Sequence, residues 1–153
     1  MYKWAVRTMI RRNIQRLNGG DYGPALAMFA ADATLSFPGD NSWARQHRDI
    51  DRGRAAFATH RGRSEIEAFL QRYVATGMQM VVEDVLVNGP PWRARAAVRA
   101  HVWSPDPAGG ADRYCNRAVL FVDTRWGRIV AQEDYEDTER AAAFDRLLDA
   151  ATG

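Results

Sequence analysis

Four carboxylate side chains lie within five residues near the end of the last strand-like segment. They are Glu133, Asp134, Glu136 and Asp137, and they follow an apolar run that ends at Ala131. Successive side chains of a strand point to opposite faces of a sheet, so a carboxylate points inward whichever face is buried. An inward carboxylate is costly unless it is protonated, paired or placed in a wet cavity. The segment therefore predicts a site of acid/base chemistry.

The roles of these carboxylates are expected to differ. Asp137 directly precedes a predicted helix, where an aspartate side chain commonly caps the first turn. Asp134 and Glu136 share one face of the strand with Gln132, whereas Glu133 lies on the other face. The alternative is that all four acids balance nearby arginines on the surface.

The elements that would position these side chains are helices first and strands second. Apolar residues at helical spacing predict a helix over residues 1–17, and Pro24 suits the first turn of a short second helix. Ser64 and Glu67 predict a capping box for a third helix, which Gly77 ends. Strands are predicted at residues 34–37, 79–87, 93–103, 114–123 and 128–136, and a last helix at 138–150.

Turn residues separate consecutive strands, which favours antiparallel hairpins and an α+β arrangement. At 153 residues with 46% hydrophobic residues, the chain is expected to form a single domain over residues 1–153. A curved mixed or antiparallel sheet around N-terminal helices would give a cone-shaped α+β barrel with a central pocket. The charged stretch at residues 40–62 is interpreted as a long loop, with a helical turn around 54–58.

Composition limits the classes of partner. The 21 basic residues nearly balance 19 acidic ones, and Lys3 is the sole lysine, so nucleic-acid binding is not expected. Cys115 is the single cysteine, which excludes an internal disulfide and a cysteine-based zinc site. His47 and His60 lack a third donor at ligand spacing, and we expect no metal and no cofactor. No apolar run is long enough for a membrane span, so a cytoplasmic protein is expected.

Several motifs in this order resemble the SnoaL-like polyketide cyclases, which belong to the superfamily of nuclear transport factor 2 and ketosteroid isomerase. The motifs are LNGGD at 17–21, FAADAT at 29–34, FPG at 37–39, HRGR at 60–63 and WGRI at 126–129. The resemblance covers nearly the whole chain and implies a cone-shaped fold with a pocket. Fold alone does not define a reaction.

The resemblance implies an isomerase, cyclase or lyase type of enzyme, acting on a small hydrophobic substrate that is carbonyl-bearing or polycyclic. SnoaL-like cyclases use an aspartate as acid/base catalyst, and Asp134 is the corresponding candidate, with Gln132 and Glu136 contacting the substrate. By analogy Arg99 and His101 also face the cavity and would polarise the substrate oxygen. Their alternation with apolar residues is equally compatible with a solvent-exposed face.

Departures from two groups of related enzymes leave other functions open. Phe37 occupies the position of the isomerase base, and Val119 corresponds to the hydrogen-bonding acid of those enzymes. Limonene epoxide hydrolases of this superfamily carry an Arg-x-Asp pair on the equivalent strand, where this sequence has Arg99-Ala100-His101. The position of that Asp is occupied by His101, which argues against water activation by the hydrolase scheme, and an epoxide hydrolase-like activity is kept as a further alternative. A binding module without catalysis is another.

The remaining candidates concern ligand binding and assembly. Phe37, Trp43 and Tyr73 are expected to line a pocket for a flat ligand, although core packing also explains such aromatics. Arg117 could bind a substrate carboxylate or phenolate, or pair with Glu133 or Asp134.

The superfamily often forms dimers through the outer sheet face, which predicts a homodimer. That surface would include four valines, Val81, Val85, Val98 and Val102.

Overall fold

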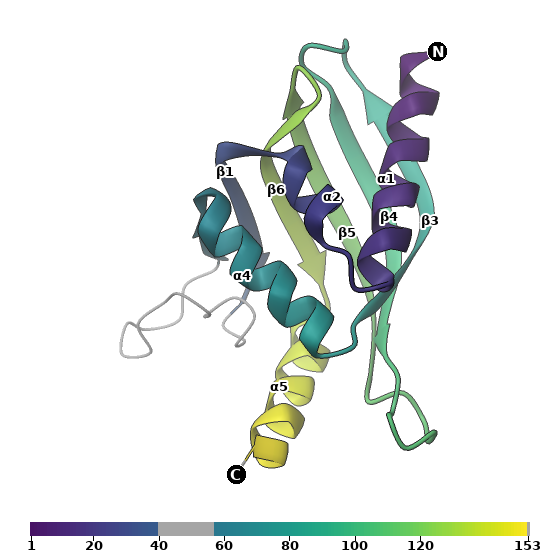
Figure 1. Ribbon diagram of the computed structural model, residues 1–153, viewed down its shortest axis with the longest axis vertical. Coiled ribbons are helices and arrows are strands. Elements are labelled where there is room, and N and C mark those ends of the chain that lie inside the picture. Colours follow the sequence, from purple (N-terminus) through teal and green to yellow (C-terminus); the bar gives the residue numbers. More distant parts are fainter. Residues whose placement is uncertain (40–56, 153) are drawn as a thin grey trace.

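The computed structural model describes residues 1–39 and 57–152 of the chain (Figure 1). The helices are α1 (Tyr2–Asn18), α2 (Gly23–Met28), α4 (Gly62–Ala75) and α5 (Thr138–Thr152). The strands are β1 (Phe29–Pro38), β2 (Phe57–Arg61), β3 (Gln79–Asn88), β4 (Arg95–Ser104), β5 (Tyr114–Arg125) and β6 (Arg128–Glu136). Trp43 and His47 lie outside the described residues.

The strands form one curved six-stranded sheet in the order β2-β1-β6-β5-β4-β3. Neighbouring strands are antiparallel except β1 and β6, which are parallel, so the sheet is mixed. Helices α1, α2 and α4 cover one face, and α5 extends beyond the end of β6 (Figure 1). This arrangement confirms the α+β fold class and the curved sheet around N-terminal helices.

Side-chain alternation decides which face of each strand is buried. In β4 the residues Ala96, Val98, Ala100 and Val102 are at most 5% exposed, whereas Arg95 and Arg99 are exposed. Apolar burial stabilises the fold by about 25 cal/mol per Å², so the valine and alanine face turns inward under the helices. The predicted valine surface for dimerisation is therefore wrong. Val85, Val98 and Val102 belong to the core, and only Val81 of the four is exposed.

The predicted loop ends earlier than expected because residues 57–61 form strand β2. This strand pairs antiparallel with β1, and Leu35 lies opposite His60. His60 is 1% exposed, and its ring lies 5.8 Å from that of Phe37 and 5.7 Å from that of Phe69. At Ala58 a strand replaces the expected helical turn.

The ends of two helices test the capping predictions. Helix α4 starts at Gly62 rather than at a Ser64–Glu67 box, because the carboxylate of Glu65 accepts a hydrogen bond from the Arg61 amide at 2.6 Å. The expected cap of the last helix is confirmed, since Asp137 Oδ1 accepts hydrogen bonds from the amides of Glu139 and Arg140. These bonds satisfy backbone donors that the first helical turn leaves unpaired.

Candidate active site

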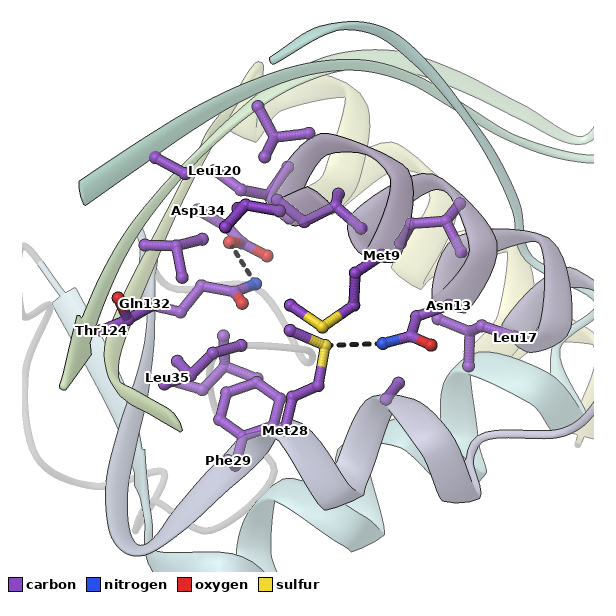
Figure 2. A pocket seen from close by; sticks show the side chains of 18 of the residues that line it. Met9, Asn13, Leu17, Met28, Phe29, Leu35, Leu120, Thr124, Gln132 and Asp134 are labelled. Carbon is purple, nitrogen blue, oxygen red and sulfur yellow. Dashed lines mark hydrogen bonds between the residues drawn. The ribbon is translucent and has the colours of Figure 1, made fainter. Parts of the chain in front are cut away.

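A cavity of about 470 Å³ lies between the concave face of the sheet and the helices. Its wall is mostly aliphatic and aromatic, and a small group of polar side chains projects from β5, β6 and α4. Figure 2 shows Gln132 and Asp134 across the cavity from Asn13 and Met9 of α1. An apolar cavity with a few convergent polar groups is typical of a small-molecule site.

Asp134 reaches this cavity from β6, where it lies opposite Leu120 of β5. The side-chain amide of Gln132 donates a hydrogen bond of 2.8 Å to its carboxylate (Figure 2). Burial raises the pKa of Asp134 to about 7; the Gln132 hydrogen bond opposes the shift, and the Glu136 charge adds to it. The side chain keeps some surface open to the cavity although it lies deep in the protein. Both protonation states are therefore populated near neutral pH.

Glu136 lies two residues further along the same face of β6. Tyr114 donates a hydrogen bond of 3.0 Å to its carboxylate, and the Asn116 amide donates one of 2.8 Å to the Tyr114 hydroxyl. Burial raises the pKa of Glu136 to about 7, against the Tyr114 hydrogen bond and with the charge of Asp145. Burial also raises the pKa of Tyr114, so this hydroxyl remains a neutral donor.

Tyr73 of α4 completes the polar group. Its side chain is buried and lines the cavity, and its hydroxyl has no hydrogen-bond partner among the described residues. Burial raises the pKa of this phenol, and the negative charge of Asp134 raises it further. A buried hydroxyl without a partner loses its hydration without compensation, so a ligand oxygen that accepts a hydrogen bond from it would be favoured.

These side chains supply the parts needed for proton transfer at an apolar ligand. Asp134 can accept or return a proton near neutral pH, and Tyr73 can donate a hydrogen bond to a developing oxyanion. The pKa of Asp134 owes its shift to burial and to Glu136, with no cation among its causes. Along the described part of the chain, the one cation that lines the cavity is Arg95, which pairs with Asp123 at 2.7 Å.

Arg99 and His101 do not take part in this group, so their predicted inward placement is wrong. Both lie on the convex face of β4, because Val98 and Val102 line the cavity and Ala100 between them is buried. Arg99 forms an ion pair of 3.1 Å with Glu83, and the His101 ring stacks on Trp103 at 5.5 Å. Of the three residues Arg99-Ala100-His101, only Ala100 faces inward. Among the described residues, the cavity therefore lacks the side chains that the epoxide hydrolase alternative requires.

In the neighbouring strand β5, the predicted inward side chain of Arg117 likewise lies on the outer face. Arg117 is exposed on the convex face and lies 3.7 Å from Glu83, so it pairs with neither Glu133 nor Asp134. Cys115 is exposed beside His101. The inward residues of β5 are Tyr114, Asn116, Ala118, Leu120 and Val122.

Four other predicted binding residues line the cavity, namely Phe37, Tyr73, Gln132 and Glu136. Phe37 is 5% exposed and packs at 4.9 Å against Phe69, so it contributes an apolar wall. Sequence reasoning missed Tyr114 and Asn116. The available signal was the hairpin register of β5 and β6, since residues opposite Asp134 and Glu136 must share their face.

Among residues 1–39 and 57–152, no group of three or more His, Cys, Asp or Glu side chains is arranged to hold a metal ion. Within the same ranges, no helix is both long and apolar enough to cross a membrane.

Comparison with known proteins identifies relatives of this architecture. The model of the SnoaL-like domain family matches residues 10–132. Bal32a, from a soil-derived mobile gene cassette, is 22% identical over 92% of this chain and 95% of its own, with a TM-score of 0.64. A Catenulispora acidiphila protein with a ketosteroid isomerase-like fold, solved in complex with trimethylamine, is 16% identical over 90% and 92%, with a TM-score of 0.63. A Sinorhizobium meliloti protein described as a polyketide cyclase is 19% identical over 84% and 94%, with a TM-score of 0.54. None of the curated proteins matches this chain significantly.

Proposed function

Because the chain belongs to the SnoaL-like domain family, we propose that it is a cofactor-independent acid/base enzyme of the isomerase, cyclase or lyase type. Its substrate is a small hydrophobic molecule with an acidic C–H bond next to a carbonyl group. The observation that carries the proposal is the Asp134 carboxylate, which faces an apolar cavity with a pKa raised to about 7. A base of this pKa suits proton transfer at neutral pH.

The reaction begins when the ionised Asp134 removes a proton from the carbon next to the carbonyl. The C–H electron pair forms the carbon–carbon double bond of an enolate, and the carbonyl oxygen takes the negative charge. Tyr73 donates a hydrogen bond to that oxygen, a contact that strengthens as the charge develops. Gln132 holds the carboxylate through its 2.8 Å hydrogen bond, which orients the base.

The fate of the enolate distinguishes the reaction types. In an isomerisation, protonated Asp134 returns its proton to a different carbon of the conjugated system. In a cyclisation, the enolate carbon attacks a second carbonyl of the same molecule, and Asp134 protonates the alkoxide that forms. Glu136, hydrogen-bonded to Tyr114, contacts the substrate beside Asp134 and supplies a second carboxyl with a pKa of about 7.

The first test uses a simple carbonyl probe, because proton abstraction precedes every one of these outcomes. 2-Tetralone has an activated C–H position between its ring and its carbonyl group. In D₂O the protein is expected to accelerate hydrogen–deuterium exchange at this carbon, measured by proton NMR. An exchange rate equal to that in buffer would refute the proposal.

Non-catalytic binding of a small molecule is the second candidate. It is favoured by Phe37, an apolar ring at the position where the resembled isomerases carry their base. In this case the probe would stabilise the protein against heat without exchanging its protons.

We further propose that the protein forms a homodimer through the convex face of the sheet. Four large apolar side chains, Val81, Leu86, Phe121 and Tyr135, are between 39% and 62% exposed. Exposed apolar residues in such numbers on one sheet favour a protein partner. Light scattering should give twice the chain mass, and Phe121→Lys should halve it. A wild-type monomer would contradict this assembly.

A further inference from the structure

The cavity has a closed end and an open end. Tyr73, Tyr114 and Met78 at the closed end are each at most 6% exposed, and Glu136 lies beside them. The exposed lining residues belong instead to the first half of α1, to the β5–β6 turn, and to the β3–β4 loop with the first residue of β4. All three segments lie at the top of Figure 1, and their exposed lining residues mark this end as the one through which a ligand enters.

Trp126 lies at this mouth in an unfavourable backbone conformation. It is the one non-glycine residue of the described chain with a positive φ, at 50°, and it is followed by Gly127 with a φ of 76°. Arg125 and Arg128 pair across the turn, so the two residues form the tip of a two-residue hairpin. Such turns strongly favour asparagine, aspartate or glycine at the first central position, because a bulky side chain is strained there.

Within residues 1–39 and 57–152, the Trp126 side chain gains little packing that would compensate for this strain. The Trp126 side chain is 76% exposed, so it contributes little to the core. Its ring lies 6.3 Å from that of Trp92, itself 54% exposed, and its amide donates a hydrogen bond of 3.3 Å to the Trp92 carbonyl. The two rings form an aromatic pair that borders the cavity through Trp126. A strained, exposed tryptophan at a cavity mouth points to a role in binding.

The distance to Asp134 indicates what such a residue could contact. Six residues of the extended strand β6 separate Arg128, which follows the turn, from Asp134, and this corresponds to about 20 Å at the rise of a strand. A one-ring ligand held at Asp134 cannot span this distance. A row of linked rings can extend from the closed end towards the mouth, where a flat face would meet the indole.

We propose that Trp126, supported by Trp92, is a specificity-determining residue that stacks on the distal flat ring of an elongated apolar ligand. The placement of the ligand's carbonyl group near Asp134 rests on the proposed function. The stacking itself requires only that an elongated ligand occupies the cavity. The expected ligand class is therefore a linear, multi-ring ketone rather than a compact one.

The test separates binding from stability. Dissociation constants of acetophenone and 4-acetyl-p-terphenyl, which carry one and three rings, are measured by equilibrium dialysis for the wild type, Trp126→Asn and Trp126→Phe. Trp4→Gln is the matched control, because Trp4 is 69% exposed but does not line the cavity. Tm is measured for each variant.

The wild type is expected to prefer the three-ring ketone. Trp126→Asn should bind that ketone about tenfold more weakly, bind acetophenone equally well, and show a Tm that is unchanged or about 2–4 °C higher. Trp126→Phe and Trp4→Gln should stay close to wild type. The proposal is overturned if the wild type shows no preference, if Trp126→Asn binds both ketones as the wild type does, or if it loses several degrees of Tm. Dissociation constants and Tm are measured without turnover. The stacking role of Trp126 can therefore be refuted while proton abstraction by Asp134 is supported, and proton abstraction can be refuted while the stacking role is supported.

Discussion

The side-chain amide of Gln132 donates a hydrogen bond of 2.8 Å to the carboxylate of Asp134, and both side chains face the cavity from the same side of β6. This bond stabilises the ionised carboxylate, whereas burial and the nearby Glu136 charge favour the protonated form. The pKa of about 7 is the balance of these effects. Gln132 and Glu136 can be replaced separately, and the two replacements should move the pKa of Asp134 in opposite directions.

Replacing Gln132 with leucine removes the hydrogen bond that lowers the pKa of Asp134. The pKa should rise, so the pH at which proton exchange of 2-tetralone reaches half of its maximum should shift upward by about one unit. Rates measured between pH 5 and 9 test this. A midpoint that stays at the wild-type pH would show that the bond does not tune the carboxylate.

Replacing Glu136 with glutamine removes a negative charge while keeping an oxygen that accepts the Tyr114 hydrogen bond. The ionised form of Asp134 is then no longer disfavoured by that charge, and its pKa should fall. The midpoint of the pH–rate profile should shift downward, with the maximal rate changed by less than about tenfold. An upward shift would contradict the electrostatic coupling of the two carboxyl groups.

Tyr73→Phe removes a buried hydroxyl that has no partner among the described residues. Loss of an oxyanion donor should lower the exchange rate by about 10²-fold. The free energy of unfolding should stay equal or rise by ~1 kcal/mol, because an unsatisfied polar group leaves the interior. Urea denaturation and exchange are measured on the same preparation. A less stable but fully active variant would assign the hydroxyl a structural role instead.

The raised pKa values also predict how stability depends on pH. Asp134 and Glu136 titrate near pH 4 in an unfolded chain and at about pH 7 in the folded protein. Between these values the folded state binds more protons, so the free energy of unfolding falls as pH rises from 4 to 7. Each carboxyl should contribute ~2–4 kcal/mol to this fall. Urea denaturation at pH 5 and 8 should show a smaller difference for Asp134→Asn than for the wild type, and equal differences would exclude a raised pKa.

The register of β6 could be predicted from sequence because the strand has one defined start. The Gly127-Arg128-Ile129 turn fixes which residues of β6 alternate inward, and the cavity wall includes Gln132, Asp134 and Glu136 as that register requires. The order of helices and strands followed from periodicity and turn residues in the same way. Strand β2 was missed because its pairing with β1 depends on residues distant in sequence.

The placement of the cations shows where sequence reasoning fails. In β4 the alternation separates Arg99 and His101 from the small apolar residues, but periodicity does not state which face is concave. Analogy with hydrolases placed the charges inward, whereas burial of Val98, Ala100 and Val102 places them outward. In β5 both faces carry apolar and polar residues, so Tyr114 and Asn116 could not be assigned without the register to β6. A shift of one residue exchanges the two faces.

Asp134→Asn tests the central claim most directly. The wild type, Asp134→Asn and the control Glu133→Gln are compared for exchange of 2-tetralone in D₂O at pH 7.5, with Tm recorded for each. Glu133 is the matched control because it neighbours Asp134 but is exposed on the opposite face of β6. Asp134→Asn should lose at least about 10²-fold in rate at an equal or higher Tm, while Glu133→Gln keeps the wild-type rate. An Asp134→Asn protein that exchanges as fast as the wild type would contradict the assignment of Asp134 as the base.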